Sequence, residues 1–354
     1  MPKRVLITGG SGFVGANLAV GLAGRHADWE IVALDNLKRR GAELNLARLR
    51  SSGVRFVHGD VRFKADLLAL DRVDAIVECS AEPSALAGVG EAPDYVVQAN
   101  LVGAYHCLEL ARRDDAQVVF MSSSRVYPYE ALDALPYREA DSRFELCPHA
   151  GPGASERGIA EDFPLAGART LYGATKLAAE LLVTEYAAVA GLPTVIDRCG
   201  VIAGPWQMGR VDQGVFTYWL LAHQLGRPLR YIGYGGSGKQ VRDLIHVDDV
   251  VELIDRQLGA PDEWRGRTVN VGGGRERSLS LLETTTLCRE LTGRVVDVGP
   301  AGEERPGDVR IYVTDAARLY ALTDWRPQRS AADTLADTAA WLRDNERLVV
   351  TALD

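Results

Sequence analysis

The stretch from residue 6 to residue 18, "LITGGSGFVGANL", decides the fold of this chain. A β-rich run ends at Thr8, and Gly9, Gly12 and Gly15 follow at the start of an apolar helical pattern. Glycines suit a tight turn whose main chain approaches a pyrophosphate, and the helix N-terminus offers free N–H groups to that anion. The GxxGxxG spacing also occurs in ordinary strand–helix turns, so the dinucleotide interpretation needs support from elsewhere in the chain.

Short apolar runs alternate with helical patterns through the first half of the chain. Helical patterns include residues 13–25 and 94–113, and the predicted strands cover residues 4–8, 30–35, 54–59, 75–79, 118–123 and 193–198. Runs that are apolar throughout are typical of strands covered on both faces. The alternation predicts an α/β fold with a Rossmann-type, doubly wound parallel sheet.

The end of the second predicted strand supports the dinucleotide site. In "VALDNL", Asp35 places a carboxylate where it can accept hydrogen bonds from a ribose 2′-hydroxyl and repel a 2′-phosphate, which favours NAD over NADP. After the third strand, Asp60 and Val61 in "HGDVR" form a natural edge for an adenine ring. Three basic residues keep NADP open as an alternative: Lys38, Arg39 and Arg40.

The regular alternation of predicted strands and helices ends after about residue 200. Turn-rich segments such as "GYGGSGKQ" (233–240) and "VGGGRERS" (271–278) separate helical patterns, and the final helical pattern begins near Ser330. We therefore predict a dinucleotide-binding domain at residues 1–199, with an active-site insertion at about 137–170. Residues 200–354 are expected to form a smaller α/β substrate-binding domain, partly interleaved with the first.

Composition excludes several classes of function. The 354 residues carry a net charge of −8 without a long Lys/Arg run, which argues against nucleic-acid binding. No apolar run approaches the ~20 residues that a membrane helix needs, and the N-terminus shows no targeting pattern. The five cysteines form neither a CxxC nor a zinc-like cluster with histidine, so no metal site is predicted. These features favour a cytoplasmic protein with reduced thiols.

A tyrosine and a lysine lie four residues apart in "TLYGATKLAAELL" (170–182). Removal of hydride from a secondary alcohol requires that the hydroxyl proton leave too, and tyrosine is a poor base at neutral pH. An ammonium group one helical turn from Tyr172, supplied by Lys176, would stabilise the phenolate. Ser124 follows the fifth strand, where its hydroxyl can reach the reacting oxygen. Each residue alone is common; their joint occurrence behind the glycine turn predicts catalysis.

These motifs resemble those of the extended short-chain dehydrogenase/reductases, the NAD-dependent nucleotide-sugar epimerases and dehydratases. The resemblance rests on "TGGSGFVG" (8–15), "DNL" (35–37), "SSSRVY" (122–127), "YGATK" (172–176), "GKQVRDLIHVDDV" (238–250) and "RPGDVR" (305–310). Within the family the chain is most similar to CDP-paratose 2-epimerases, on the long segment at 137–173, "DQGVFTYW" (212–219) and "GSGKQVRDLIHVDDV" (236–250). The resemblance implies a homodimer, with helices at 94–113 and 174–190 as its candidate contacts.

The resemblance also implies site residues. The catalytic group would be Ser124, Tyr172 and Lys176. NAD would be bound by Gly9, Gly12, Phe13, Val14, Gly15, Asp35, Asn36, Asp60, Val61, Ser80, Ala81, Asn100, Ser122, Tyr172, Lys176 and Arg198. The nucleotide sugar would be bound by Glu82, Ser123, Ser124, Arg125, Cys147, Gly200, Gln213, Arg242 and Arg305. Arg242 and Arg305 match positions that usually contact the diphosphate; the alternative for each is a surface salt bridge to Asp243 or Asp308.

Two segments depart from the family pattern. "RCGVIAGPWQ" (198–207) replaces an aromatic residue and an asparagine after the arginine, and "ECSAEPS" (78–84) stands where "HLAA"-like text is common. The family's dehydratases carry an Asp–Glu pair beside the serine or threonine, whereas Arg125 and Val126 follow Ser124. An epimerase is therefore expected, acting at C2 of a CDP-deoxyhexose; C4 epimerisation of a UDP- or NDP-hexose and a silent NAD-binding sensor are the alternatives.

Overall fold

The computed structural model describes residues 2–84, 86–88, 90, 92–209 and 213–353. Its centre is a seven-stranded parallel sheet in the order β15-β11-β5-β4-β1-β2-β3. The strands are β1 (Arg4–Thr8), β2 (Glu30–Asp35), β3 (Arg55–His58), β4 (Ala75–Glu78), β5 (Gln117–Ser123), β11 (Thr194–Cys199) and β15 (Arg267–Val271). The predicted Rossmann-type fold is confirmed, and the strand order reverses between β1 and β4, where such sheets bind ligands beyond the carboxyl ends.

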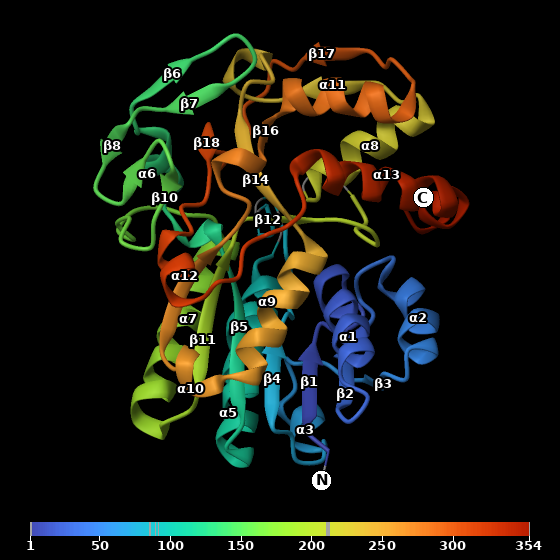
Figure 1. Ribbon diagram of the computed structural model, residues 1–354, viewed down its shortest axis with the longest axis vertical. Coiled ribbons are helices and arrows are strands. Elements are labelled where there is room, and N and C mark those ends of the chain that lie inside the picture. Colours follow the sequence, from blue (N-terminus) through green and yellow to red (C-terminus); the bar gives the residue numbers. More distant parts are fainter. Residues whose placement is uncertain (1, 85, 89, 91, 210–212, 354) are drawn as a thin grey trace.

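Helices cover both faces of this sheet (Figure 1). One face carries α1 (Phe13–Arg25), α2 (Asn45–Ser51), α9 (Val247–Gly259), α10 (Pro261–Trp264) and α12 (Ala317–Leu322). The other carries α3 (Lys64–Leu68), α4 (Asp94–Val97), α5 (Gly103–Asp114) and α7 (Leu171–Ala190). The predicted helix at 94–113 is continuous in path, but a π-helical segment, Gln98–Val102, joins α4 to α5.

The second half of the chain contributes to two layers. Helix α9 and strand β15 return to the parallel sheet, so its seventh strand comes from beyond residue 200. The sequence analysis predicted no strand of this sheet in that region. The remaining elements lie over the carboxyl ends of the parallel strands (Figure 1). They are β12 (Val201–Ala203), α8 (Val215–Leu225), β13 (Leu229–Tyr231), β14 (Val241–His246), β16 (Ser278–Ser280), α11 (Leu281–Thr292), β17 (Val298–Pro300), β18 (Ile311–Tyr312) and α13 (Ala331–Leu353).

The segment between β5 and α7 forms a short helix and short antiparallel strands beside β18. They are α6 (Tyr129–Asp133), β6 (Tyr137–Glu139), β7 (Phe144–Leu146), β8 (His149–Gly151), β9 (Ala154–Ser155) and β10 (Gly158–Ile159). Their apolar side chains pack with Tyr127 and Tyr312 in a separate cluster. This insertion also packs against α7 through Leu177.

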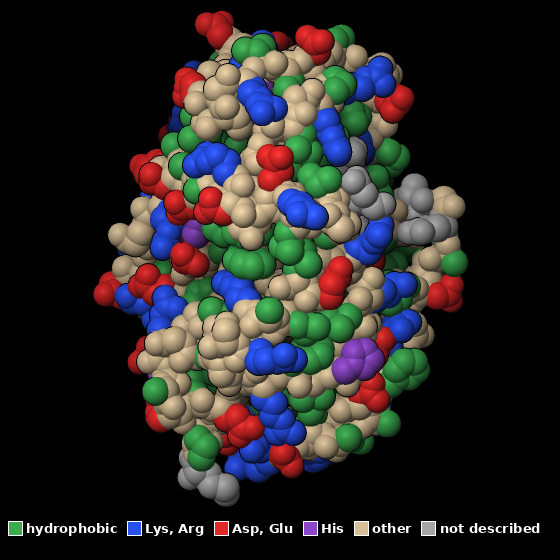
Figure 2. Space-filling model, turned by 90° about the vertical axis from the view of Figure 1, so that its right-hand side faces the viewer, with side chains coloured by type: hydrophobic (Ala, Val, Ile, Leu, Met, Phe, Trp, Pro, Cys, Tyr) green, Lys and Arg blue, Asp and Glu red, His purple; other side chains and the backbone are tan. Residues whose placement is uncertain are grey.

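The surface carries mixed charge. On the face shown in Figure 2, basic and acidic side chains are interspersed, without a stripe of one sign among the described residues. No helix in the described ranges is both long and apolar enough to cross a membrane.

Candidate active site

The turn from β1 into α1 is built on glycine. Gly9 has φ +62°, and the N–H of Gly12 donates to its carbonyl oxygen at 2.9 Å. A Cβ atom added to Gly15 would lie 2.2 Å from that same oxygen, so no other residue fits there without moving the turn. The first turn of α1 has no acidic residue and no side-chain cap, which leaves its N–H groups available for an anion.

A cavity of about 350 Å³ opens at this turn. Asp35 lies at its edge, and its carboxylate accepts hydrogen bonds from the N–H groups of Ser11 (3.1 Å) and Leu37 (2.8 Å). Burial raises the pKa of Asp35, although these N–H groups oppose the shift. The predicted cofactor residues that line this cavity are Gly9, Gly12, Phe13, Val14, Gly15, Asp35, Asn36, Asp60, Val61, Ser80 and Ala81.

Asp60, which also lines this cavity, is held by two partners. The amide of Asn36 donates to Asp60 at 2.9 Å, and Arg62 forms an ion pair with Asp60 at 2.7 Å. Burial raises the pKa of Asp60, but the hydrogen bonds from Arg62 and Asn36 outweigh it and hold that pKa below its ordinary value. The basic residues Lys38, Arg39 and Arg40 also line the cavity. In the sequence, these three residues were the reason to keep NADP as an alternative cofactor.

Three residues that were predicted to contact the cofactor have their polar groups bonded to other protein groups. Arg198 is 6% exposed and forms an ion pair with Glu180 at 2.8 Å, and the hydroxyl of Ser122 donates to the same carboxylate at 2.5 Å. Asn100 accepts from the N–H of Glu82 at 2.7 Å and donates to Thr175 at 3.3 Å. Arg198 and Asn100 line neither large cavity, so their contact with NAD stays a prediction.

A second cavity, of about 540 Å³, adjoins the first. The three predicted catalytic residues, Ser124, Tyr172 and Lys176, all line it. Thr170 caps α7, because its side chain accepts from the N–H of Gly173 at 3.4 Å. A Cβ atom on Gly173 would lie 2.1 Å from the carbonyl oxygen of Arg125. The first turn of α7 is thus seated directly on the serine turn, which brings Tyr172 to the cavity beside Ser124.

The base of the cavity holds a contact that the sequence did not predict. Lys176 is 2% exposed, and its Nζ atom lies 3.3 Å from Oε2 of Glu78 at the end of β4. The only signal in the sequence was the departure "ECSAEPS", where an ionisable residue stands at an otherwise apolar strand end.

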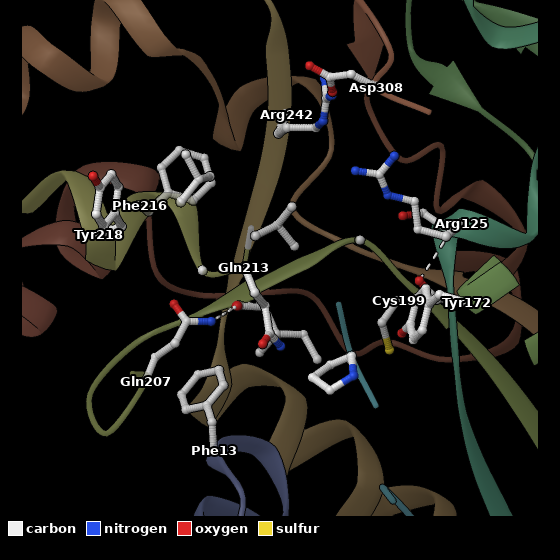
Figure 3. Close-up of a pocket in the computed structure, with 18 of the residues that line it drawn as sticks. Phe13, Arg125, Tyr172, Cys199, Gln207, Gln213, Phe216, Tyr218, Arg242 and Asp308 are labelled. Atoms are coloured by element: carbon white, nitrogen blue, oxygen red, sulfur yellow. Dashed lines mark hydrogen bonds and ion pairs between the residues drawn. The ribbon is translucent and has the colours of Figure 1, made fainter. Parts of the chain in front are cut away.

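Arginines gather on one wall of the larger cavity (Figure 3). Arg125 points into the cavity and donates to the carbonyl oxygen of Gly307 at 2.8 Å, with no carboxylate partner in the described part of the chain. Burial lowers the pKa of Arg125. Arg242 pairs with Asp308 at 2.6 Å, the salt bridge foreseen as its alternative, yet it still lines the cavity, as does Arg305.

Aromatic side chains form the opposite wall. Figure 3 shows Phe216 and Tyr218 of α8 across the cavity from the arginines. Trp219 follows them, and its indole N–H donates to Thr285 at 2.9 Å. The cavity therefore joins a cationic wall to a flat apolar wall, an arrangement that suits a diphosphate attached to a planar base.

The other predicted substrate residues divide between three places. Ser123, Gly200 and Gln213 line the larger cavity. Glu82 lines the smaller cavity at the glycine turn and not the larger one, although its neighbours Ala81 and Pro83 line both. Cys147 lies between β7 and β8 and lines neither of the two large cavities, so its contact with substrate stays a prediction.

The departure after Arg198 shapes the cavity wall. Cys199, Gly200 and Val201 all line it. A Cβ atom on Gly200 would lie 3.1 Å from the Thr314 hydroxyl and 3.2 Å from the carboxylate of Asp243. The glycine thus lets the chain pass close to two buried polar groups, while the neighbouring side chains present a small, apolar surface to a ligand.

Together, the fold and site are those of a dinucleotide-dependent enzyme, with a tyrosine–lysine pair lining the cavity beside the glycine turn. The chain belongs to the NAD dependent epimerase/dehydratase family, whose pattern matches residues 5–272, and its cofactor is NAD.

Named relatives span nearly the whole chain. The chain is 29% identical to the CDP-paratose 2-epimerase of Salmonella typhi, covering 96% of this chain and 98% of the relative. It is 31% identical to the dTDP-glucose 4,6-dehydratase of Mycolicibacterium smegmatis, covering 97% and 94%. Among solved structures, a dTDP-glucose 4,6-dehydratase double mutant from Streptomyces venezuelae with bound NAD superposes with a TM-score of 0.78, at 28% identity and 99% coverage of both chains.

Proposed function

We propose that this protein is an NAD-dependent nucleotide-sugar epimerase that acts at C2 of a CDP-linked deoxyhexose. The observation that carries the proposal is the content of the larger cavity. It combines Tyr172, Lys176 and Ser124 beside the dinucleotide cavity, and it has Arg125 where the family's dehydratases carry an acid. The similarity to a CDP-paratose 2-epimerase over nearly the full length supports the choice of nucleotide and carbon.

Residues of the chain accept and return the proton of the sugar hydroxyl. Tyr172 takes the proton of the sugar hydroxyl, and the Lys176 ammonium stabilises the negative charge that the phenol oxygen acquires. The Ser124 hydroxyl donates a hydrogen bond to the reacting oxygen as it becomes a carbonyl. The adjoining cavity would hold NAD, which would supply a reversible hydride acceptor for the sugar carbon. The same Tyr172 then gives the proton back to the product.

Inversion requires the planar keto-sugar to present its other face. The nucleotide end must stay anchored while the sugar turns. Arg242 and Arg305 would hold the diphosphate, and the aromatic wall of α8 would hold the base. On the sugar side, Cys199, Gly200 and Val201 offer small surfaces, which leave room for rotation.

A panel of CDP-, UDP-, GDP- and dTDP-sugars, followed by NMR, tests the proposal. In D₂O, hydride transfer through bound NAD gives a C2 epimer without deuterium at C2, whereas deprotonation of carbon would introduce deuterium. Conversion of a UDP- or other NDP-hexose at C4 would reassign the carbon, and formation of a 4-keto-6-deoxy product would overturn the epimerase proposal.

Variants link the chemistry to the residues. Tyr172→Phe should abolish turnover while retaining bound NAD; Tyr186→Phe, on the same helix and bonded to Glu109 at 2.8 Å, is the matched control. Ser124→Ala should lose turnover as well. Ser123 also lines the cavity, and its Oγ atom accepts from the N–H of Arg125 at 3.2 Å. A larger loss in Ser123→Ala than in Ser124→Ala would move the serine role to Ser123.

A further inference from the structure

Lys176 is buried against a single carboxylate. Its side chain is 2% exposed and that of Glu78 is 1% exposed, and the two residues lie 98 positions apart in the chain. The ammonium group also lies over the ring of Phe120, 4.6 Å from its centroid. Oε1 of Glu78 has no side-chain hydrogen-bond partner among the described residues, and Lys176 is the cation whose charge acts on this carboxylate, beside a backbone N–H of Ser80.

A contribution to folding stability does not account for a buried ion pair. Desolvation of two charges offsets their attraction, and apolar residues of similar size usually stabilise a core at least as well. The position is more informative. Lys176 is one helical turn from Tyr172 and lines the larger cavity, and Cys79, the residue after Glu78, lines both cavities. The pair therefore lies next to a residue that the linings of the two cavities share.

Among the described residues, Glu78 is the one carboxylate that acts on Lys176. The titratable groups that act on it come from β4, α5, β11 and its own helix: Glu78, Cys79, Cys107, Cys199 and Tyr172. Burial raises the pKa of all three thiols, which therefore stay neutral. Burial raises the pKa of Glu78 as well, and the charge of the Lys176 ammonium is the largest influence that opposes this rise. Glu78 is thus the carboxylate in this set that balances the ammonium before the reaction begins.

We propose that Glu78 is a positioning residue that keeps Lys176 in its ammonium form and directs that group towards Tyr172. This role rests on the proposed function, in which the ammonium stabilises the phenolate. Burial acts to lower the pKa of Lys176, but the charge of Glu78, followed by Tyr172, outweighs it and raises that pKa overall. Without the carboxylate, burial alone would act, and lysines buried without a partner lose their proton near neutral pH.

Carbon-13 NMR of ε-labelled lysine tests this directly in the NAD-bound protein without substrate. The chain has only five lysines, and Lys176→Arg assigns the signal of Lys176. In Glu78→Gln the Lys176 signal should titrate about 3 pH units lower than in the wild type. Glu78→Asp, which keeps the charge, should titrate close to the wild type and also serves if the glutamine variant folds poorly.

The matched control is Glu109→Gln. This carboxylate pairs with the half-exposed Lys64 at 2.9 Å, so its removal should leave the Lys176 signal unchanged. An identical Lys176 titration in Glu78→Gln and the wild type would overturn the proposal. So would an equal shift in Glu78→Asp and Glu78→Gln, because the role would then depend on side-chain length and not on charge.

Kinetics separate this inference from the proposed function. On the sugar that the panel identifies, kcat of Glu78→Gln should fall as pH rises through neutrality while KM stays constant, and the wild type should show no such fall. If no sugar is converted, the proposed function fails while the NMR result stands. If sugars are converted and Lys176 titrates normally in Glu78→Gln, only the role of Glu78 fails.

Discussion

Replacement of Gly173 by alanine tests how the catalytic helix is seated. The added Cβ atom would lie 2.1 Å from the carbonyl oxygen of Arg125 and 2.9 Å from its carbonyl carbon. Ordinary contacts begin at 3.4 Å, so helix α7 and the serine turn must separate by about 1 Å. Main-chain atoms lie on both sides of this contact, and neither side can relieve it by a side-chain rotation.

The expected effect is on catalysis more than on cofactor binding. A displacement of about 1 Å at a catalytic group costs on the order of 100-fold in rate. We therefore expect Gly173→Ala to lower kcat about 100-fold, since Tyr172 moves relative to Ser124. NAD content should stay at the wild-type level, because the glycine turn and Asp35 lie on other elements. The assay combines NMR turnover with the NAD released on denaturation and the Tm from circular dichroism.

Gly24→Ala is the matched control. Gly24 lies in the last turn of α1, and an added Cβ would meet nothing within 4 Å. Alanine in a helix is favoured over glycine by about 1 kcal/mol, so this variant should be fully active and slightly more stable. A Gly173→Ala protein with wild-type kcat and Tm would refute the conclusion that the close approach to Arg125 positions Tyr172. A large drop in Tm would show a general loss of fold instead.

Further predictions concern the cofactor, the buried charges and the assembly. Asp35→Asn should weaken NAD binding about tenfold and reduce the ratio of the affinity for NAD to that for NADP, both measured by isothermal titration calorimetry. Burial raises the pKa of Asp197 to about 7, so its contribution to stability is present below pH ~4 and is lost as pH rises through 7. Asp197→Asn should therefore reduce the loss of unfolding free energy between pH 5 and pH 8 in urea titrations. Arg198→Ala leaves the Glu180 carboxylate buried and unpaired and should cost about 3 to 5 kcal/mol of unfolding free energy. We propose a homodimer through α5 and α7; Leu181, 64% exposed on α7, should give monomers when replaced by glutamate, as sedimentation would show.

Much of the fold could be predicted because its signals are local. Six strands of the central sheet appeared as short apolar runs, and the structure confirms each within one or two residues. The seventh, β15, was missed because Arg267–Val271 lies in a turn-rich region and becomes a strand only by pairing with β11. Its place in the sheet depends on a neighbour more than 60 residues away, which no local pattern records.

The sequence alone determined the parts of the site that depend on neighbours along the chain. Gly9, Gly12 and Gly15 follow from the shape of one turn, and Tyr172 and Lys176 follow from one turn of helix, because such geometry is set within a few residues. Only the tertiary structure decided which distant groups meet them. It brought Glu78 to Lys176 because α7 packs on β5, the sheet neighbour of β4, paired Arg198 with Glu180, and left Cys147 outside the two large cavities. The reason is physical: a buried charge is partnered by whatever the packing brings within reach, and packing is a property of the whole chain.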